Sequence, residues 1–217
     1  MKRIFDKITI LSTVVILLPI IPALILYNQI PEVVAIHFDA KGVADGWASR
    51  AFAVFALPAL LAALNIFTQF MLLSDPKRDV HSKLFLLGRW SIAPISIIAN
   101  TATLMIALSI KISIERIIPL AVAILFLVIG NYLPKSKQNF TIGIRLPWTL
   151  ASEENWNKTH RFAGWVWTIG SLILIITSIK GFSALTIFIV ITALMSIIPI
   201  VYSYIYYQKE EETKDKS

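Results

Sequence analysis

The sequence ITILSTVVILLPIIPALILY, residues 8–27, is 20 residues long and contains no charged side chain. A helix needs roughly 20 residues to cross the hydrocarbon core of a bilayer, which is about 30 Å thick. Backbone groups in that core must be satisfied internally, so only helices and closed barrels span it. Barrel strands alternate in polarity over about 10 residues, whereas this run is continuously apolar. The stretch therefore predicts a transmembrane helix.

Five further apolar runs have the same character and predict an all-α, polytopic integral membrane protein with about six transmembrane helices. They lie near Ala51–Leu73, Trp90–Ile110, Ile117–Leu133, Phe162–Ile179 and Phe182–Tyr207. The third run has an alternative, earlier start at Leu84, which takes in Arg89. The composition agrees, because 57% of the residues are hydrophobic and only 15% are charged, against about 25% charged residues in soluble proteins.

The spans divide the chain into two predicted regions. Residues 1–110 form an N-terminal membrane region with the first three spans and a long loop, residues 28–50. Residues 111–217 form a C-terminal membrane region with the last three spans and a polar segment, residues 134–161. The basic N-terminus resembles a signal peptide, but its apolar run is longer than the usual 7–15 residues. We therefore expect an uncleaved first span.

The distribution of basic residues predicts the orientation of the chain. Of the 20 Lys and Arg residues, 15 fall on the side that holds both termini. Basic residues are enriched in cytoplasmic loops, so we expect both termini and the 134–161 segment in the cytoplasm of a multi-pass cell-membrane protein. The net charge of +7 then reflects topology, and we expect no direct binding of nucleic acid. The sequence contains no Cys, which excludes disulfides and thiolate metal sites.

The 28–50 loop is predicted to lie outside the cell. Residues 33–38 are suited to a short extended segment, and turn-forming residues follow them. One interpretation makes His37, Asp39 and Asp45 an N/O metal site. The other makes the loop a polar turn, with Trp47 anchoring the second span at the lipid headgroups. We favour the turn and predict no metal and no cofactor.

The polar segment contains the sequence NFTIGIRLPWTL, residues 139–150, in which Gly and Pro impose local geometry. Gly143 permits backbone conformations that other residues resist, and Pro147 favours an extended Leu146. Ser152, followed by two Glu, predicts a helix start that continues into the fifth span.

Two interpretations of this segment remain open. In the first, it is a cytoplasmic binding platform built from aromatic and basic side chains, namely Arg145, Trp148, Trp156, His160 and Arg161. In the second, it is an interfacial helix whose aromatic side chains lie at headgroup depth and whose Arg side chains reach the phosphates.

The spans offer little for catalysis. Their polar residues are mostly Asn, Gln and Thr, with no charged residue clearly at mid-membrane, whereas pumps and intramembrane enzymes usually need one. We therefore predict no catalytic residue and no enzyme activity. A small-molecule or lipid-linked transporter is the alternative to a binding protein. It rests on prolines that kink the spans and on similar sequences at 28–31 and 131–134, which suggest an inverted repeat.

Both loops resemble known families. The pattern Ile30-Pro31, His37-Phe38-Asp39, Gly42, Asp45-Gly46-Trp47 and Ser49-Arg50 resembles the DUF1648 domain. The pattern of the second segment resembles the SdpI family signature: Gly130-Asn131, Pro134-Lys135, Asn139, Ile142-Gly143-Ile144-Arg145, Pro147-Trp148-Thr149-Leu150, Glu154, Trp156 and Thr159-His160-Arg161. The chain departs from these patterns at Leu146, where the family usually has Thr, and at Ala35, where it usually has a second Pro.

The resemblance implies a membrane immunity protein that gives resistance to a secreted SDP-like killing peptide. In the family, this role is joined to signalling: with toxin present, a cognate repressor is held at the membrane. The partners implied are therefore the lipid bilayer, a secreted peptide toxin and an ArsR-like repressor. The residues assigned to the toxin are Pro31, His37, Asp39, Gly42, Asp45 and Trp47. The residues assigned to the cytoplasmic partner are Asn139, Gly143, Arg145, Pro147, Trp148, Thr149, Glu154, Trp156, His160 and Arg161.

Overall fold

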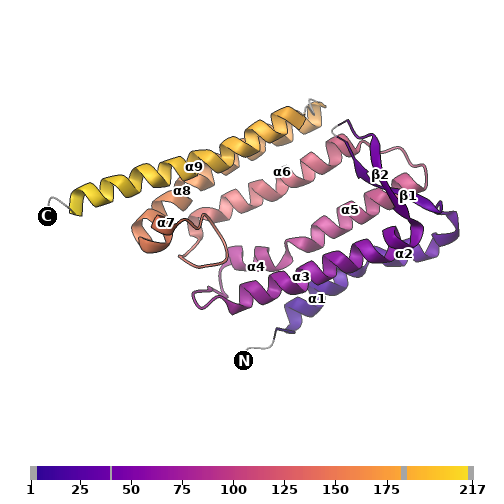
Figure 1. Cartoon of the computed structure of the whole chain (residues 1–217), viewed down its shortest axis with the longest axis horizontal. Coiled ribbons are helices and arrows are strands. Elements are labelled where there is room, and N and C mark those ends of the chain that lie inside the picture. Colours follow the sequence, from indigo (N-terminus) through magenta and orange to yellow (C-terminus); the bar gives the residue numbers. More distant parts are fainter. Residues whose placement is uncertain (1–3, 40, 182–184, 215–217) are drawn as a thin grey trace. The chain divides into compact units, whose positions relative to one another are not determined.

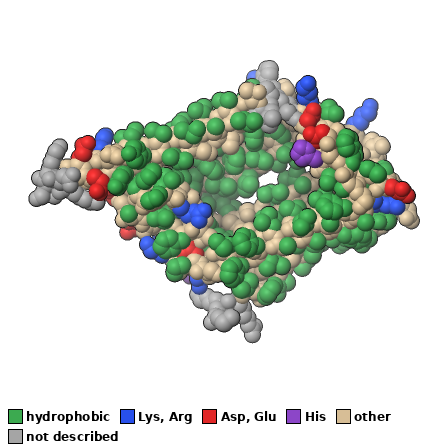
Figure 2. Space-filling view, viewed as in Figure 1, with side chains coloured by type: hydrophobic (Ala, Val, Ile, Leu, Met, Phe, Trp, Pro, Cys, Tyr) green, Lys and Arg blue, Asp and Glu red, His purple; other side chains and the backbone are tan. Residues whose placement is uncertain are grey.

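The computed structural model describes residues 4–39, 41–181 and 185–214. Within these residues, six helical segments are long and apolar enough to cross a membrane: Lys7–Ile25, Phe52–Ser74, Lys83–Ala107, Ile114–Lys135, Glu153–Lys180 and Thr186–Thr213. Figure 2 shows hydrophobic side chains over most of the visible helix surfaces, with many of the charged side chains near helix ends and in loops. The predicted all-α, polytopic membrane class is confirmed.

The chain forms two compact units. The first comprises the residues up to Leu73 together with Arg89–Ile118, and the second comprises Ser74–Gly88 together with the residues from Pro119 onward. These units are defined by packing, so the division between residues 110 and 111, predicted from the order of the spans, stays a prediction. The loop between the second and third spans belongs to the second unit, although it lies between two segments of the first.

The first unit is built from helices and one hairpin (Figure 1). Its elements are α1 (Lys7–Leu17), α2 (Ile20–Ile25), the 3-10 turn η1 (Tyr27–Gln29), β1 (Val33–Phe38), β2 (Ala44–Ser49), the π-helical turn η2 (Phe52–Ala56), α3 (Leu57–Ser74) and α5 (Ile92–Ala107). Pro19 lies at the break between α1 and α2. A core of Ile16, Ala62, Ile92 and Ala93 joins α1, α3 and α5.

The two strands pair antiparallel and form a hairpin beside α5 and η2. In Figure 1 the hairpin lies at the end of this unit remote from the N-terminus. The extended segment predicted at residues 33–38 is confirmed as β1. The second strand was not predicted, because Ala44, Asp45 and Gly46 are all poor strand formers. Backbone pairing with β1 stabilises β2 in spite of that local preference.

The third span begins at the earlier of its two predicted starts. It consists of α4 (Lys83–Trp90) and α5, so Arg89 lies inside it. The guanidinium of Arg89 is buried and donates to both carboxylate oxygens of Asp6, at 2.8 and 2.5 Å. It also donates to Gln69 Oε1 at 2.6 Å and to Thr9 Oγ1 at 2.9 Å. A buried charge is tolerated only when paired in this way, and the pairing with Arg89 lowers the pKa of Asp6 to about 2.

The second unit contains most of α6 (Ile114–Tyr132) and the C-terminal helices. Its other elements are α4, the 3-10 turn η3 (Leu133–Lys135), α7 (Pro147–Ala151), α8 (Glu153–Lys180) and α9 (Leu185–Lys214). A core of Ala123, Leu174 and Met195 joins α6, α8 and α9.

Two glycines let α6 and α8 approach closely. A Cβ atom on Gly164 would lie 2.4 Å from Cγ of Pro134, and one on Gly130 would lie 2.9 Å from Cβ of Trp167. Small residues of this kind let helix backbones approach within a membrane.

Helix α8 has 28 residues and begins at Glu153, directly after the predicted cap Ser152, and it continues into the fifth span as predicted. The apolar run itself was predicted to begin nine residues later, at Phe162, because hydropathy identifies only the apolar part of a helix, whereas capping determines where the helix begins. The helix ends at Gly181, which takes a left-handed conformation with φ of +73°. The predicted start of the sixth span, Phe182, lies outside the described residues.

Candidate functional site

The start of α8 forms the base of the second polar segment. Ser152 is extended and its side chain accepts a hydrogen bond from the backbone N–H of Asn155 at 3.1 Å, which confirms the predicted N-cap. Glu153 and Glu154 occupy the first turn, where carboxylates are favoured by the helix dipole. The next turn places Trp156 inside the protein.

Trp156 and His160, one helical turn apart, have no exposed surface. Their rings stack with centroids 4.0 Å apart and planes inclined by 22°. The indole N–H of Trp156 donates to the carbonyl of Ser136 at 2.8 Å. Both side chains therefore hold the polar segment from within, and they offer no surface to a partner in this conformation.

The side chain of His160 binds the backbone of the loop directly. The backbone N–H of Ile144 donates to Nε2 of His160 at 2.9 Å, and Nδ1 lies 2.8 Å from the carbonyl of Trp156. Since Nε2 accepts a hydrogen bond, the proton of the neutral ring is assigned to Nδ1, which donates to that carbonyl. The ring thus ties the loop to the helix by two hydrogen bonds.

Gly143 makes this close approach possible. Its φ is +117°, a conformation that L-residues rarely adopt, and a Cβ atom there would lie 2.3 Å from Nε2 of His160. The special geometry predicted for Gly143 is therefore present, and its cause is the buried imidazole beneath it.

The Pro147 turn is fixed by Thr149. Leu146 is extended, with φ of −108° and ψ of 155°, as expected before a proline. The buried Thr149 hydroxyl accepts from the N–H of Leu146 at 2.9 Å and donates to the carbonyl of Ile144 at 2.8 Å. One side chain thereby satisfies the backbone on both sides of Arg145.

Trp148 fastens α7 to the last helix. Its indole N–H donates to the hydroxyl of Ser203 at 3.0 Å. The ring stands edge-on to Tyr204, with centroids 5.3 Å apart, and stacks with Tyr207 at 6.0 Å. Asn155 adds a hydrogen bond from Nδ2 to the carbonyl of Ser203 at 3.1 Å. Trp148 is half-buried, so only part of it is available to another molecule.

Five of the predicted residues are exposed: Gly143, Arg145, Pro147, Glu154 and Arg161. Arg145 donates through Nη1 to the carbonyl of Phe140 at 2.6 Å, which holds its guanidinium at the loop surface. Glu154 lies 2.9 Å from Lys158 and accepts from the hydroxyl of Tyr206 at 2.6 Å. The structure thus divides the predicted set into a buried support and an exposed surface.

Asn139 shapes the loop that precedes Gly143. Its Oδ1 accepts from the N–H groups of Thr141 and Ile142, at 2.9 and 2.6 Å. Its Nδ2 donates to the carbonyl of Ile142 at 3.0 Å. Both ends of the side-chain amide are therefore used within one turn.

Sequence analysis missed Asp75, which supports this same loop. Its carboxylate is 4% exposed and accepts from the backbone N–H of Phe140 at 2.8 Å, from the hydroxyl of Thr141, and from the N–H of Lys77 at 2.8 Å. Nearby, Asp79 pairs with Lys137 at 3.1 Å, and the hydrogen bond from Lys137 lowers the pKa of Asp79. An Asp before Pro76 reads as an ordinary turn, and no local pattern signals a partner 65 residues away.

The hairpin of the first unit holds the other predicted residues. His37 and Asp45 face each other across the strands, with Nδ1 and Oδ1 2.5 Å apart, and both are exposed. Trp47 is 59% exposed, and Pro31 is also exposed at the base of the hairpin. The hairpin therefore exposes polar and aromatic groups.

The turn of the hairpin uses Asp39 and Gly42. One oxygen of Asp39 accepts from the N–H groups of Lys41 and Val43, each at 2.8 Å, and these hydrogen bonds lower the pKa of Asp39. Gly42 has φ of +77°, and a Cβ atom there would lie 2.8 Å from a carboxylate oxygen of Glu115. Among the described residues, no three His, Asp or Glu side chains group closely enough to hold a metal ion.

Arg50 anchors the hairpin to the end of the first span. Its Nη1 donates to the carbonyls of Tyr27 and Ile30, each at 3.0 Å. The guanidinium also lies over the ring of Tyr27, 4.5 Å from its centroid. Arg50, which belongs to the Ser49-Arg50 pair of the sequence pattern, therefore fixes the hairpin to the end of the first span.

Comparison with known proteins confirms the resemblance expected from the sequence. Residues 135–203 match the SdpI/YfhL protein family, and residues 14–62 match the domain of unknown function DUF1648. The chain is 29% identical over 204 residues to the Immunity protein SdpI of Bacillus subtilis (strain 168). The aligned region covers 94% of this chain and 97% of that protein. No solved structure matches the chain. The match therefore extends over both the hairpin and the second polar segment.

Proposed function

We propose that this chain is a membrane immunity protein that protects its cell from a secreted SDP-like killing peptide by binding it. One observation carries the proposal: the chain aligns with an immunity protein over 94% of its own length and 97% of its relative's. The alignment thus includes both the hairpin and the second polar segment.

The proposed orientation places both termini in the cytoplasm, with the hairpin outside and the 134–161 segment inside, as the distribution of basic residues favours. A secreted peptide would then meet the hairpin first. His37, Asp45 and Trp47 are exposed there, and aromatic side chains such as Trp47 are enriched in recognition surfaces.

Protection by binding, with no chemical reaction, is supported by how the charged groups near the spans are used. Arg89 is bound by Asp6, Gln69 and Thr9, and His160 has both ring nitrogens in structural hydrogen bonds. The ring nitrogens of His160 contact only backbone groups, and the guanidinium of Arg89 has no acceptor atom with which to take a proton from the Thr9 hydroxyl that it binds. We infer no catalytic residue.

We further propose that the exposed part of the second polar segment docks a cytoplasmic repressor of the ArsR-like kind. The surface would consist of Arg145, Pro147, Glu154 and Arg161. The support is the rigidity of the backbone: His160, Thr149 and Asp75 hold the loop that carries Arg145 and Pro147, and Glu154 and Arg161 lie in helix α8. The surface is therefore preorganised, and a partner would order little on binding.

The test expresses the chain in a host sensitive to the SDP peptide and measures survival across peptide concentrations. We expect the lethal concentration to rise relative to the empty vector. An unchanged lethal concentration, with the protein shown to be in the membrane, would count against immunity to this peptide. Because the chain has no Cys, Ser49→Cys and Ala151→Cys provide a matched topology test. Only Ser49→Cys should react with a membrane-impermeant thiol reagent in intact cells.

A further inference from the structure

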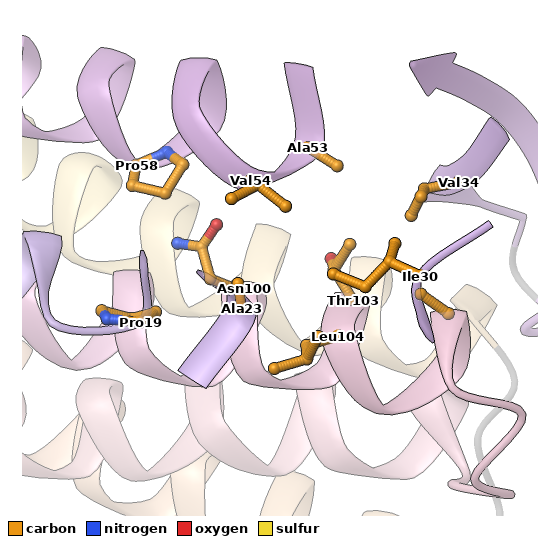
Figure 3. A pocket seen from close by; sticks show the side chains of 11 residues that line it. Pro19, Ala23, Ile30, Val34, Ala53, Val54, Pro58, Asn100, Thr103 and Leu104 are labelled. Atoms are coloured by element: carbon orange, nitrogen blue, oxygen red, sulfur yellow. The ribbon is translucent and has the colours of Figure 1, made fainter. Parts of the chain in front are cut away.

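The two faces of the hairpin have different surroundings. Val34 of β1 is 2% exposed and lines a small cavity with Ile30 and Val54, between the hairpin and the membrane-spanning helices (Figure 3). Ile36 packs against the same apolar core. Because successive side chains of a strand point to opposite faces of a sheet, Val33 lies on the face that points away from the helices.

This outer face carries an exposed apolar patch. Val33 is 63% exposed and Trp47 is 59% exposed. In the register of the two strands, Val33 lies opposite Ser49 and Trp47 lies opposite Ala35. Val33 and Trp47 are therefore diagonal neighbours on one face, within reach of an aromatic side chain, and Ala35 is too small to cover the indole ring. Together, Val33 and Trp47 form the outer patch.

The outer patch points toward water in the proposed orientation. The core beneath the hairpin includes Ala53 and packs against Tyr27 and Ala107, which lie at the outer ends of the second, first and third spans. A face that points away from these helix ends also points away from the bilayer around them. Lipid accounts for apolar side chains along the spans, but it does not account for this patch. Apolar patches exposed to water mark interaction sites.

The hairpin that carries the outer patch is acidic, although the net charge of the whole chain is +7. Residues 31–49 contain three acidic residues and one basic residue, namely Glu32, Asp39, Asp45 and Lys41. Asp45 and Trp47 both occupy exposed positions in the alternating pattern of β2, and Glu32 directly precedes Val33. Both carboxylates are therefore close to the outer patch, and they favour a partner with a positive charge beside its apolar groups.

We propose that the outer patch binds an apolar segment of the killing peptide that has a positive charge beside it, a conclusion that rests on the proposed immunity function. Trp47 is the anchor, because Trp is among the residues that contribute most to binding at protein interfaces. The apolar segment covers Trp47 and Val33, and the positive charge lies near Glu32 and Asp45. A lipid-headgroup anchor, the other role open to Trp47, needs its ring to point toward the bilayer, and the outer face points the other way.

The first experiment measures binding of the SDP peptide to purified variants in nanodiscs. Trp47→Ala should raise the dissociation constant about tenfold or more, as the loss of an interface anchor does. Trp47→Phe keeps an aromatic ring and should stay within about threefold of the parent. Phe67→Ala is the matched control, because Phe67 is an aromatic side chain that is 60% exposed on the second span, and it should bind like the parent. Equal binding by Trp47→Ala and the parent would overturn the inference.

The same titration at two salt concentrations tests the charge assigned to the peptide segment. Salt screens interactions between exposed charges, so binding should weaken as the ionic strength rises. Glu32→Gln removes one carboxylate beside the outer patch and should reduce this dependence on salt. Binding that is independent of ionic strength would overturn the assignment of a positive charge.

The second experiment tests directly whether the peptide covers the outer patch. Val33→Cys provides the single thiol of a chain without Cys, and Asn28→Cys, exposed in the 3-10 turn η1, is its control. A membrane-impermeant thiol reagent should label both variants in intact cells, and the SDP peptide should slow the labelling of Val33→Cys alone.

Two results of this labelling would overturn the inference. If the reagent labels Asn28→Cys but not Val33→Cys in the absence of peptide, the outer patch lies in lipid. If the peptide binds the parent but leaves the labelling rate of Val33→Cys unchanged, the peptide binds elsewhere. A parent chain that neither binds the peptide nor protects cells would instead contradict the proposed function itself.

Discussion

Replacing Gly143 by Ala tests whether the buried imidazole organises the second polar segment. The added Cβ would lie 2.3 Å from Nε2 of His160, far inside van der Waals contact. The loop must withdraw, which breaks the 2.9 Å hydrogen bond from Ile144. Leaving a buried acceptor unsatisfied costs about 1–3 kcal/mol, and the backbone conformation at φ of +117° costs a similar amount for a residue other than glycine. We expect a loss of about 4 kcal/mol in the stability of the second unit.

The assay is thermal unfolding of the purified protein in detergent or nanodiscs. Ala151→Ser, a change at an exposed site in α7, is the control and should unfold within about 0.5 kcal/mol of the parent. The double variant Gly143→Ala with His160→Ala separates the two contributions, because it removes the steric overlap and keeps the backbone strain. If Gly143→Ala unfolds at the temperature of the parent, the contact between Gly143 and His160 does not organise the loop.

Three further predictions concern the hydrogen bonds that hold each unit. Asp75→Asn should speed proteolysis and amide exchange of residues 138–145, at a cost of about 2 kcal/mol, while Asp79→Asn, with a more exposed carboxylate, should change them little. Arg89 lowers the pKa of Asp6 to about 2, so this pair stabilises the fold above pH 4 and loses its contribution as the pH falls toward 2. The free energy of unfolding should therefore change by about 1 kcal/mol between these pH values, after allowance for solvent screening, and Asp6→Asn should remove this change. Trp148→Phe should keep the aromatic stacking, lose the hydrogen bond to α9, and lower stability by about 1 kcal/mol.

Local chemistry made several features predictable from the sequence. Continuous apolar runs identified the spans, because a bilayer imposes a length and a polarity on them. Ser152 before two acids identified a helix start. Gly143 identified a place of unusual backbone geometry. In each case the decisive physical effect acts within a few residues of the pattern.

Contacts distant in sequence were not predictable in the same way. The inward orientation of His160 depends on the Ser136 and Ile144 segments that pack against its turn. Asp75 acts on Phe140, 65 residues later, and its neighbours in sequence resemble any polar turn. The strand β2 forms through pairing with β1, against the preference of its own residues. Periodicity and propensity carry no information on such partners.

The central claim, that the chain protects by binding the killing peptide, is tested most directly by equilibrium binding. Purified protein in nanodiscs would be titrated with the SDP peptide, with protein-free nanodiscs of the same lipid composition as the control. We predict saturable binding of the peptide above the control. Uptake of peptide equal to that of the protein-free nanodiscs, at concentrations at which cells are protected, would contradict the claim.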